Sequence, residues 1–295
     1  MYKIFFTSVL VFACSLGIQA QEFQGMAVYE TKTSTADFKK RMEGNKNMTP
    51  DIQKRIEEGM KSMFEKTFIL NFDKAASIYK EQEKLDSPGQ GGGMRMMMSS
   101  MTGGGGTFYK NVKDKSYVVD KDFMGKEFLV KDSLPNLKWK MEGETRVIGG
   151  YNCFKATAIV AVNKTDFRNF APKKEDDKAA KPADEGKKTN LLDNLEMPKE
   201  ATITAWYTPE IPVNQGPENY WGLPGLILEV NDGKTIILCS KVVMNPKEKA
   251  VIKAPTKGKV ITQKEFDETV IKKMEEFRQM NQGQGRTNGG FRIGG

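Results

Sequence analysis

The chain has 295 residues, with 46 Lys and Arg against 38 Asp and Glu, which gives a net charge of +8 at pH 7. It contains no histidine, which excludes Ser-His-Asp and Cys-His catalytic groups and histidine-based zinc, iron and Cu(II) sites. The charge is spread along the chain with acids interleaved, which is typical of a solvated surface and does not favour a nucleic-acid partner. We therefore expect no cofactor and no enzymatic activity.

Residues 1–20 have the three parts of a secretory signal peptide. Lys3 is an early cation, residues 4–13 form an apolar run, and small residues follow, so cleavage is expected after Ala20. A lipoprotein cut before Cys14 is the alternative, but Phe12 is bulky where a small residue is usual. The sequence thus predicts an exported protein, periplasmic or associated with the outer membrane. No later apolar run is long enough to span a bilayer.

The remainder is expected to form a single β domain over residues 21–280. Two low-complexity inserts interrupt it, at residues 86–106 and 172–190. A glycine-rich tail follows at residues 281–295 and is expected to be disordered, because glycine loses the most conformational freedom on folding.

Short strand-like runs follow one another along the domain without regular helices between them. They cover residues 23–31, 67–72, 77–81, 107–110, 115–120, 127–131, 144–148, 152–162, 201–207, 226–231 and 235–243. Residues 73–76 and 231–234 have turn composition between consecutive runs. This pattern predicts an antiparallel meander rather than a parallel sheet.

Two helices are expected within this pattern. The first begins near Thr49, an N-cap followed by proline, and the second begins at Thr262, which forms a capping-box pattern with Glu265. Their apolar positions at helical spacing are expected to face the core. These positions are Ile52, Ile56, Met60 and Met63 in the first helix, and Phe266, Val270, Met274 and Phe277 in the second.

Residues 222–227 read GLPGLI, and their surroundings are equally distinctive. Upstream lie AWYTPEIP at residues 205–212, IGGYNCFKA at residues 148–156, and FQGMAVYE at residues 23–30. In these segments, from Phe23 to Met244, the chain resembles the GLPGLI family. The resemblance implies a secreted protein of a Gram-negative bacterium with no settled activity, and it supplies no catalytic residues.

The GLPGLI segment has two interpretations. In the structural one, Pro224 and Gly225 form a turn in which the glycine is left-handed, and a strand buried on both faces follows. In the other, the segment is the mouth of a ligand site, because Trp and Tyr often line such sites. The residues concerned are Trp206, Tyr207, Tyr220, Trp221, Leu223, Pro224 and Gly225.

Two cysteines, Cys153 and Cys239, remain after signal cleavage. In an oxidising compartment they favour a disulfide, although two buried and inert thiols fit the sequence as well. A cluster of methionines in the first insert is a weak candidate for Cu(I), since thioethers are soft ligands; an exposed low-complexity loop is the alternative. The cluster consists of Met94, Met96, Met97, Met98 and Met101.

The order of elements resembles that of periplasmic lipoprotein carriers, which implies a mainly β (α+β) fold: a curved antiparallel sheet, or half-barrel, with two or three helices. We accordingly expect a non-enzymatic binding or carrier protein for an apolar ligand such as a lipid or a lipidated partner. The alternative is a structural or interaction protein accessory to an outer-membrane complex. A deep apolar cavity would favour the carrier, and a packed concave face would favour the interaction protein. The oligomeric state is not predicted.

Overall fold

The computed structural model describes residues 23–34, 49, 51, 54, 65–82, 106–162, 171–172, 195–196 and 199–284. The signal peptide, most of the helix expected from Thr49, the five clustered methionines and most of both inserts lie outside these residues. Within the described part, none of the helices is long and apolar enough to cross a bilayer.

The fold is mainly β, as expected, and consists of one twelve-stranded open sheet with a two-stranded ribbon beside it. The sheet order is β14-β6-β5-β4-β3-β2-β1-β13-β12-β11-β8-β7. The strands are β1 (Gly25–Thr33), β2 (Lys66–Phe72), β3 (Ala76–Glu81), β4 (Thr107–Asn111), β5 (Ser116–Phe123), β6 (Lys126–Ser133), β7 (Lys140–Ile148), β8 (Tyr151–Ala161), β11 (Glu200–Thr208), β12 (Leu226–Asn231), β13 (Thr235–Met244) and β14 (Lys259–Ile261), with β9 (Ala171–Pro172) and β10 (Leu195–Glu196) in the ribbon.

The sheet is antiparallel except where β14 pairs with β6 in parallel. All eleven strand runs read from the sequence are present, and both expected turns form. Asp73 Oδ1 accepts the N–H groups of Ala75 and Ala76, and Asp232 Oδ1 accepts those of Lys234 and Thr235. The prediction of a meander, in which each strand pairs with the next one in the chain, was wrong. Strand β1 lies between β2 and β13 and joins two groups of strands.

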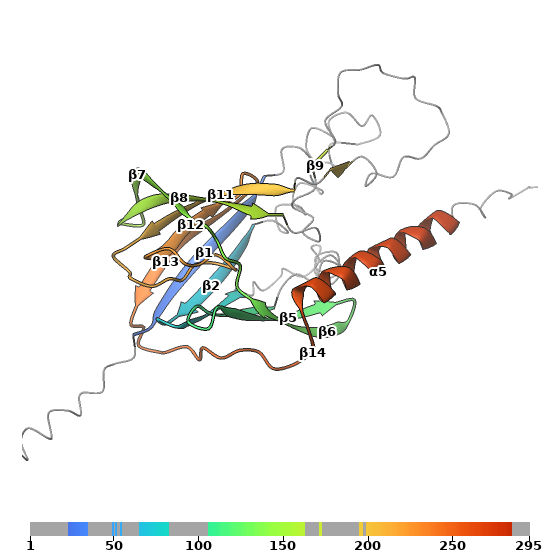
Figure 1. Cartoon of the computed structure of the whole chain (residues 1–295), viewed down its shortest axis with the longest axis horizontal. Coiled ribbons are helices and arrows are strands. Elements are labelled where there is room, and N and C mark those ends of the chain that lie inside the picture. The colour runs from blue at the N-terminus through green and yellow to red at the C-terminus, as the bar shows by residue number, and fades with distance from the viewer. Residues whose placement is uncertain are drawn as a thin grey trace, which may run out of the picture.

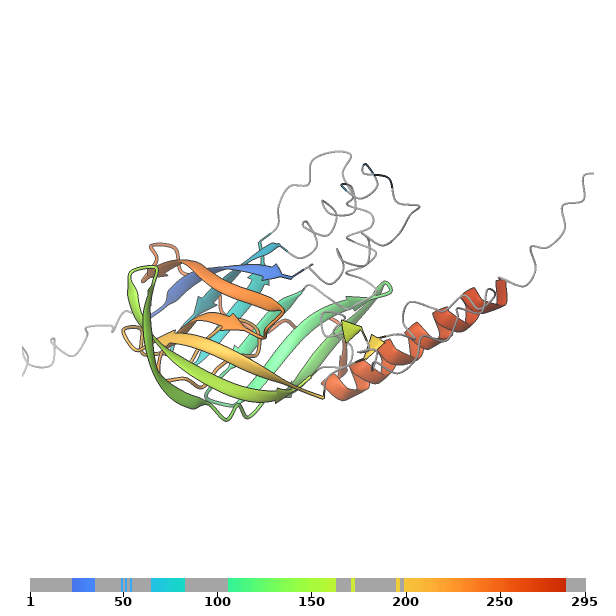
Figure 2. The ribbon, with the colours of Figure 1, turned by 90° about the horizontal axis from the view of Figure 1, so that it is seen from above.

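The chain connectivity requires the sheet to curl. Strands β6 and β7 are ten places apart in the sheet order but are consecutive in the chain, joined by residues 134–139. A flat sheet would separate them by about 48 Å, whereas the connecting segment spans at most about 25 Å. Figures 1 and 2 show the resulting shape, a strongly curved sheet that wraps around an interior.

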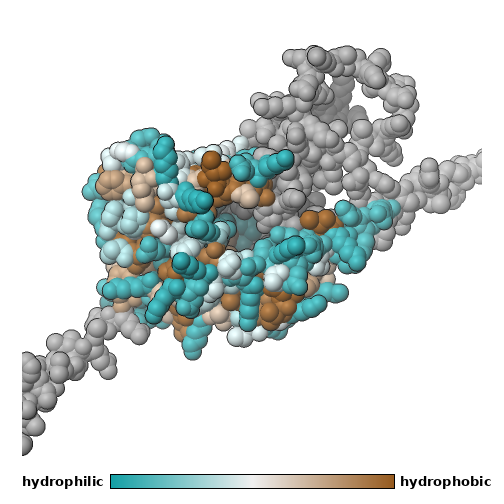
Figure 3. Space-filling model, viewed as in Figure 1, coloured by the Kyte–Doolittle hydropathy of each residue, from teal (hydrophilic) through white to brown (hydrophobic). Residues whose placement is uncertain are grey.

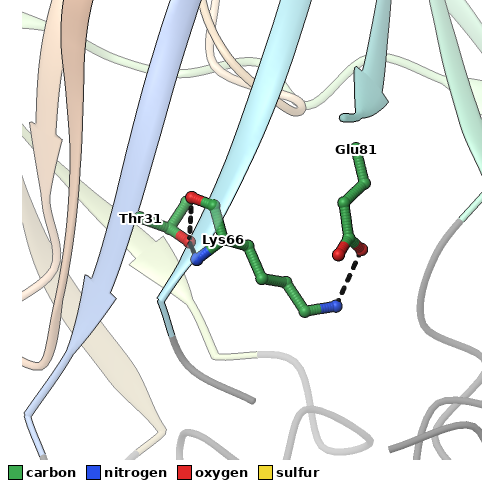
Figure 4. A network of polar contacts seen from close by, with 3 residues as sticks. All are labelled: Thr31, Lys66 and Glu81. Atoms are coloured by element: carbon green, nitrogen blue, oxygen red, sulfur yellow. Dashed lines mark hydrogen bonds and ion pairs between the residues drawn. The ribbon is translucent and has the colours of Figure 1, made fainter. Parts of the chain in front are cut away.

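Lys66, at the start of β2, connects three neighbouring strands at one end of the sheet (Figure 4). Its backbone N–H donates to Thr31 Oγ1 on β1 at 3.2 Å, and its ammonium lies 2.8 Å from a carboxylate oxygen of Glu81 on β3. Both side chains of the ion pair are about four-fifths buried, which strengthens the pair relative to one in bulk water.

Among the described residues, one helix can be bounded, α5 (Gln263–Gln284), so the two or three helices expected are not shown. Its capping box forms as expected, since Thr262 N–H donates to Glu265 Oε2 at 2.7 Å and Glu265 N–H donates to Thr262 Oγ1 at 3.2 Å. Phe266 and Val270 are buried against β5 and β6, and the rest of the helix projects away from the sheet (Figure 1). The helix continues to Gln284, into the residues expected to form the disordered tail.

Candidate functional site

The loop of residues 209–225, which connects β11 to β12, packs into the core at the end of the curved sheet where β1 begins; we call it the β11–β12 loop. Ile211, Val213, Gln215 and Leu223 are all buried within it. The loop folds back on the strand that follows, because Leu226 N–H donates to Ile211 O and Ile227 N–H donates to Gln215 O, both at 3.0 Å. At this end of the sheet, the concave side is therefore occupied by the protein's own chain.

Lys110, on β4, holds this loop through a buried ammonium group. The side chain is 1% exposed, and Nζ donates to the carbonyl oxygens of Gly216 at 2.7 Å, Glu218 at 3.0 Å and Tyr220 at 2.9 Å. An ammonium has three N–H donors and no acceptor, so the three carbonyls satisfy it completely. A buried cation is costly unless it is bonded in this way.

Burial lowers the pKa of Lys110 from 10.5 to about 7, and the carboxylate of Glu218 opposes that shift. The three carbonyl oxygens suit the charged form, because a neutral amine has only two N–H donors and would leave one carbonyl without a partner. Burial thus disfavours the charged form of this one side chain, and the three carbonyl groups offset part of that cost.

Two more polar side chains on neighbouring strands bind the same region. Ser77 lies opposite Lys110 in the β3–β4 ladder and donates to Gln215 Oε1 at 2.9 Å. Tyr29 on β1 donates to Ile227 O at 2.7 Å. Burial raises the pKa of Tyr29 further above its ordinary value, so the hydroxyl stays a donor. Gln215 Nε2 is buried and has no hydrogen-bond partner among the described residues.

Two tryptophans join the β11–β12 loop to the segment that crosses from β6 to β7. Trp139 Nε1–H donates to Trp221 O at 2.9 Å, and Trp221 Nε1–H donates to Pro135 O at 2.8 Å. Both acceptors are backbone carbonyls, so each indole satisfies a group that has no strand partner. The two bonds connect the loop to residues 134–139, which close the distance between β6 and β7.

The four aromatic residues named with the GLPGLI segment fall into two groups. Trp206 and Tyr207 belong to the larger core cluster, where the Arg146 guanidinium lies 4.2 Å from the centre of the Trp206 ring. Tyr220 packs at the edge of that cluster, whereas Trp221 packs against a second cluster under β5, β6 and α5.

Gly225 is required for a different reason from the one expected. The left-handed residue of the segment is Gly222, with φ of +93°. Gly225 is needed because its backbone lies close to that of Thr208: a Cβ atom at Gly225 would lie 2.2 Å from Thr208 O. The strand expected after it is confirmed as β12, in which residues 226–230 are all buried.

A shallow depression of about 390 Å³ lies beside the loop, lined by Lys74, Ala75, Val112, Lys113, Asn214 and Trp221. One lining residue, Asn214, belongs to the β11–β12 loop, and its Nδ2–H donates to Leu223 O at 3.2 Å. Leu223 is completely buried and Pro224 is exposed. The predicted residue Trp221 thus lines a surface depression, and the interior behind it is packed.

Cys153 and Cys239 are free thiols in the structure, both buried in the larger cluster. Desolvation raises the pKa of each thiol to about 11. The thiolate is the nucleophile and the metal ligand, so this environment makes both cysteines unreactive. The described residues contain no group of three or more His, Cys, Asp or Glu side chains placed to hold a metal ion.

Lys110 was not predicted from the sequence, although a signal for it exists. In β4 it is two positions after Phe108, so the period-two pattern of a strand places both side chains on one face. A lysine on the inner face of an otherwise apolar sheet requires acceptors, and only the fold reveals that the β11–β12 loop provides them.

One protein-family model matches the chain, over residues 139–229, and is described as "Protein of unknown function (Porph_ging)". The match covers the end of the crossing segment, β7, β8, β11, the β11–β12 loop and most of β12. The comparison with curated proteins gave no match. Two solved structures of PNGF-II, in space groups C2 and P21, each cover 85% of this chain at 15% identity with a TM-score of 0.45. The chain spans about a third of their length, 33% and 34%.

Proposed function

We propose that the protein is an exported, non-enzymatic interaction protein of the cell envelope, accessory to an outer-membrane complex. The observation that carries this proposal is the packing of the β11–β12 loop against the concave side of the sheet. A carrier of an apolar ligand needs a cavity that buries most of that ligand. Here the β11–β12 loop occupies the corresponding space and is held by Lys110, so the interaction-protein alternative is the better supported of the two.

The exterior also fits an interaction protein better than a carrier. The depression beside Trp221 is shallow and flanked by the lysines Lys74 and Lys113, which suits no buried acyl chain. On the face that Figure 3 shows, apolar residues form separate patches among polar ones. The signal-peptide pattern of residues 1–20 supports export of the chain.

Native mass spectrometry of the mature protein, purified from its own envelope without detergent, tests this function. We expect the mass of the polypeptide alone, unchanged after incubation with lipids extracted from the same envelope. A stoichiometric lipid that organic solvent releases would overturn the proposal in favour of a carrier.

A matched pair of variants shows whether the loop is what keeps lipid out. Lys110→Met removes the loop anchor, whereas Lys113→Met removes an exposed lysine three residues away. We expect a folded Lys110→Met protein to admit an apolar dye such as anilinonaphthalene sulfonate and the Lys113→Met protein to exclude it. Equal dye binding by wild type and both variants would contradict a filled interior.

A further inference from the structure

Strand β7 is one edge of the sheet, and its outer side has no partner among the described residues. Its ladder runs to β8 alone, and seven of its nine residues are exposed. An exposed edge strand is a template for pairing with another strand. The ladder to β8 is irregular between Met141 and Thr145, but the strand itself continues through Lys140–Ile148.

The hairpin turn identifies which backbone groups point outward. Gly149 and Gly150 have φ of 59° and 87°, as a two-residue type I′ turn requires. In such a hairpin the flanking pair, Ile148 and Tyr151, exchanges ladder hydrogen bonds, and alternation leaves the N–H and C=O of Val147 and Thr145 directed away from β8. Asn152 N–H, opposite Val147, points the other way and donates to Glu210 Oε1 at 2.8 Å, in agreement with this alternation.

Apolar side chains flank these outward backbone groups. Val147 is 67% exposed, and Phe154, which lies opposite Thr145 on β8, is 38% exposed. Because Thr145, Val147 and Phe154 lie on one face of the hairpin, an added strand could cover them while it pairs with β7.

The charges of β7 are complementary to those of a second, antiparallel copy of the same strand. We propose that β7 pairs antiparallel with β7 of a second copy of this chain, with Thr145 on the two-fold axis. Glu144 of each copy then lies opposite Arg146 of the other, which gives two pairs of opposite charge. In the same register, the outward-facing N–H and C=O of Thr145 bond to the C=O and N–H of Thr145 in the other copy. A two-fold axis on Glu144 or on Arg146 would instead place like charges opposite each other.

Contacts within the chain already orient the side chains of Arg146 and Glu144. Arg146 is fixed by the Trp206 ring and by a hydrogen bond to Glu229, yet its side chain remains 38% exposed. A guanidinium has five N–H donors, so it can bind a second carboxylate. Glu144 is 61% exposed and lies 2.6 Å from Lys155 Nζ, which orients it at the edge. This dimer goes beyond the proposed function and does not depend on it.

Sedimentation velocity of the mature chain at about 100 µM, far above the dissociation constant of a stable dimer, tests the proposal. We expect a dimer for wild type. Thr145→Pro should be monomeric and folded, because it removes only an N–H that faces away from the β8 ladder. Glu144→Arg should raise the dissociation constant roughly tenfold or more, whereas Glu127→Arg, at an exposed glutamate on β6, should leave it unchanged.

A mixing experiment then tests the register. Glu144→Arg alone and Arg146→Glu alone each set like charges opposite one another, but one copy of each variant restores two opposite-charge pairs. We expect the mixture to dimerise with a dissociation constant near that of wild type and each variant alone to dimerise roughly tenfold or more weakly, with circular dichroism to show that both are folded. A monomeric wild type, or a Thr145→Pro protein that remains dimeric, would overturn the proposal even if a variant fails to fold.

Discussion

The Lys110 ammonium donates to the Gly216 carbonyl oxygen at 2.7 Å, although the two residues are 106 positions apart. This bond, with those to Glu218 and Tyr220, joins β4 to the β11–β12 loop. It explains how a glycine-rich and proline-rich loop is held in the interior of a sheet, where its carbonyl groups would otherwise lack partners.

Lys110→Met should destabilise the protein by roughly 3 kcal/mol or more, because three buried carbonyl groups lose their donor. The exposed control Lys113→Met should change the free energy of unfolding by at most about 0.5 kcal/mol. Urea unfolding followed by tryptophan fluorescence measures both. Equal midpoints for the two variants would show that the anchor does not hold the fold.

The low pKa of Lys110 predicts a specific dependence of stability on pH. The folded protein releases the Lys110 proton near pH 7, whereas the unfolded chain keeps it up to about pH 10.5. The unfolded state therefore binds more protons between these values, and the free energy of unfolding should rise with pH in this window by up to about 1.4 kcal/mol per pH unit.

The pH measurement is made as a difference between wild type and Lys110→Met, from pH 6 to pH 9. The variant keeps the other titrating groups, including Cys153 and Cys239, whose raised pKa values lower the free energy of unfolding as the pH rises above about 8.5. Stability curves that stay parallel over this range would contradict a buried Lys110 that titrates.

Gly225→Ala should cost roughly 3 kcal/mol or more, because the new methyl group would meet the backbone of Thr208 rather than a side chain that can move. Gly143→Ala is the control, since a Cβ atom there has nothing within 4 Å and the residue has no positive φ. Thermal unfolding of both variants compares them. A Gly225→Ala protein as stable as the control would show that the chain passes Thr208 less closely.

The cysteines should be inert in the folded protein. Without reductant, iodoacetamide should modify neither Cys153 nor Cys239 under native conditions and both after unfolding, as buried free thiols require. A mass that shows no alkylation even in denaturant would instead support the disulfide that the sequence favoured.

The N-terminus of the protein made by its own cells should be Gln21. Intact mass spectrometry distinguishes this outcome from a diacylated Cys14, which would be heavier by its acyl chains. A lipidated mass would place the protein on a membrane surface and would contradict cleavage after Ala20.

The strands were predictable because their signals are local. Alternation of buried and exposed residues in β13 and the Asp73 and Asp232 turns follow from a few consecutive residues. The position of β1 between β2 and β13, and the parallel pairing of β14, depend on contacts between distant parts of the chain. Sequence periodicity carries no information on such contacts.

The site was predictable in part for the same reason. The GLPGLI segment directed attention to the β11–β12 loop, but the loop's partners Lys110, Ser77 and Trp139 lie on other strands and segments far away in the chain. The expected carrier rested on a concave apolar face. The sheet is curved as expected, but the position of the loop that packs against its concave side could be found only in three dimensions.

Hydrogen exchange of the β11–β12 loop shows whether this loop is part of the core. The amides of Val213, Gly222 and Gly225 all donate to carbonyl groups within the loop. Near pH 6, where Lys110 is charged, they should exchange as slowly as the buried strand β12, through global unfolding alone. Exchange of these amides many times faster than that of β12 would contradict a buried β11–β12 loop and would favour a carrier of an apolar ligand.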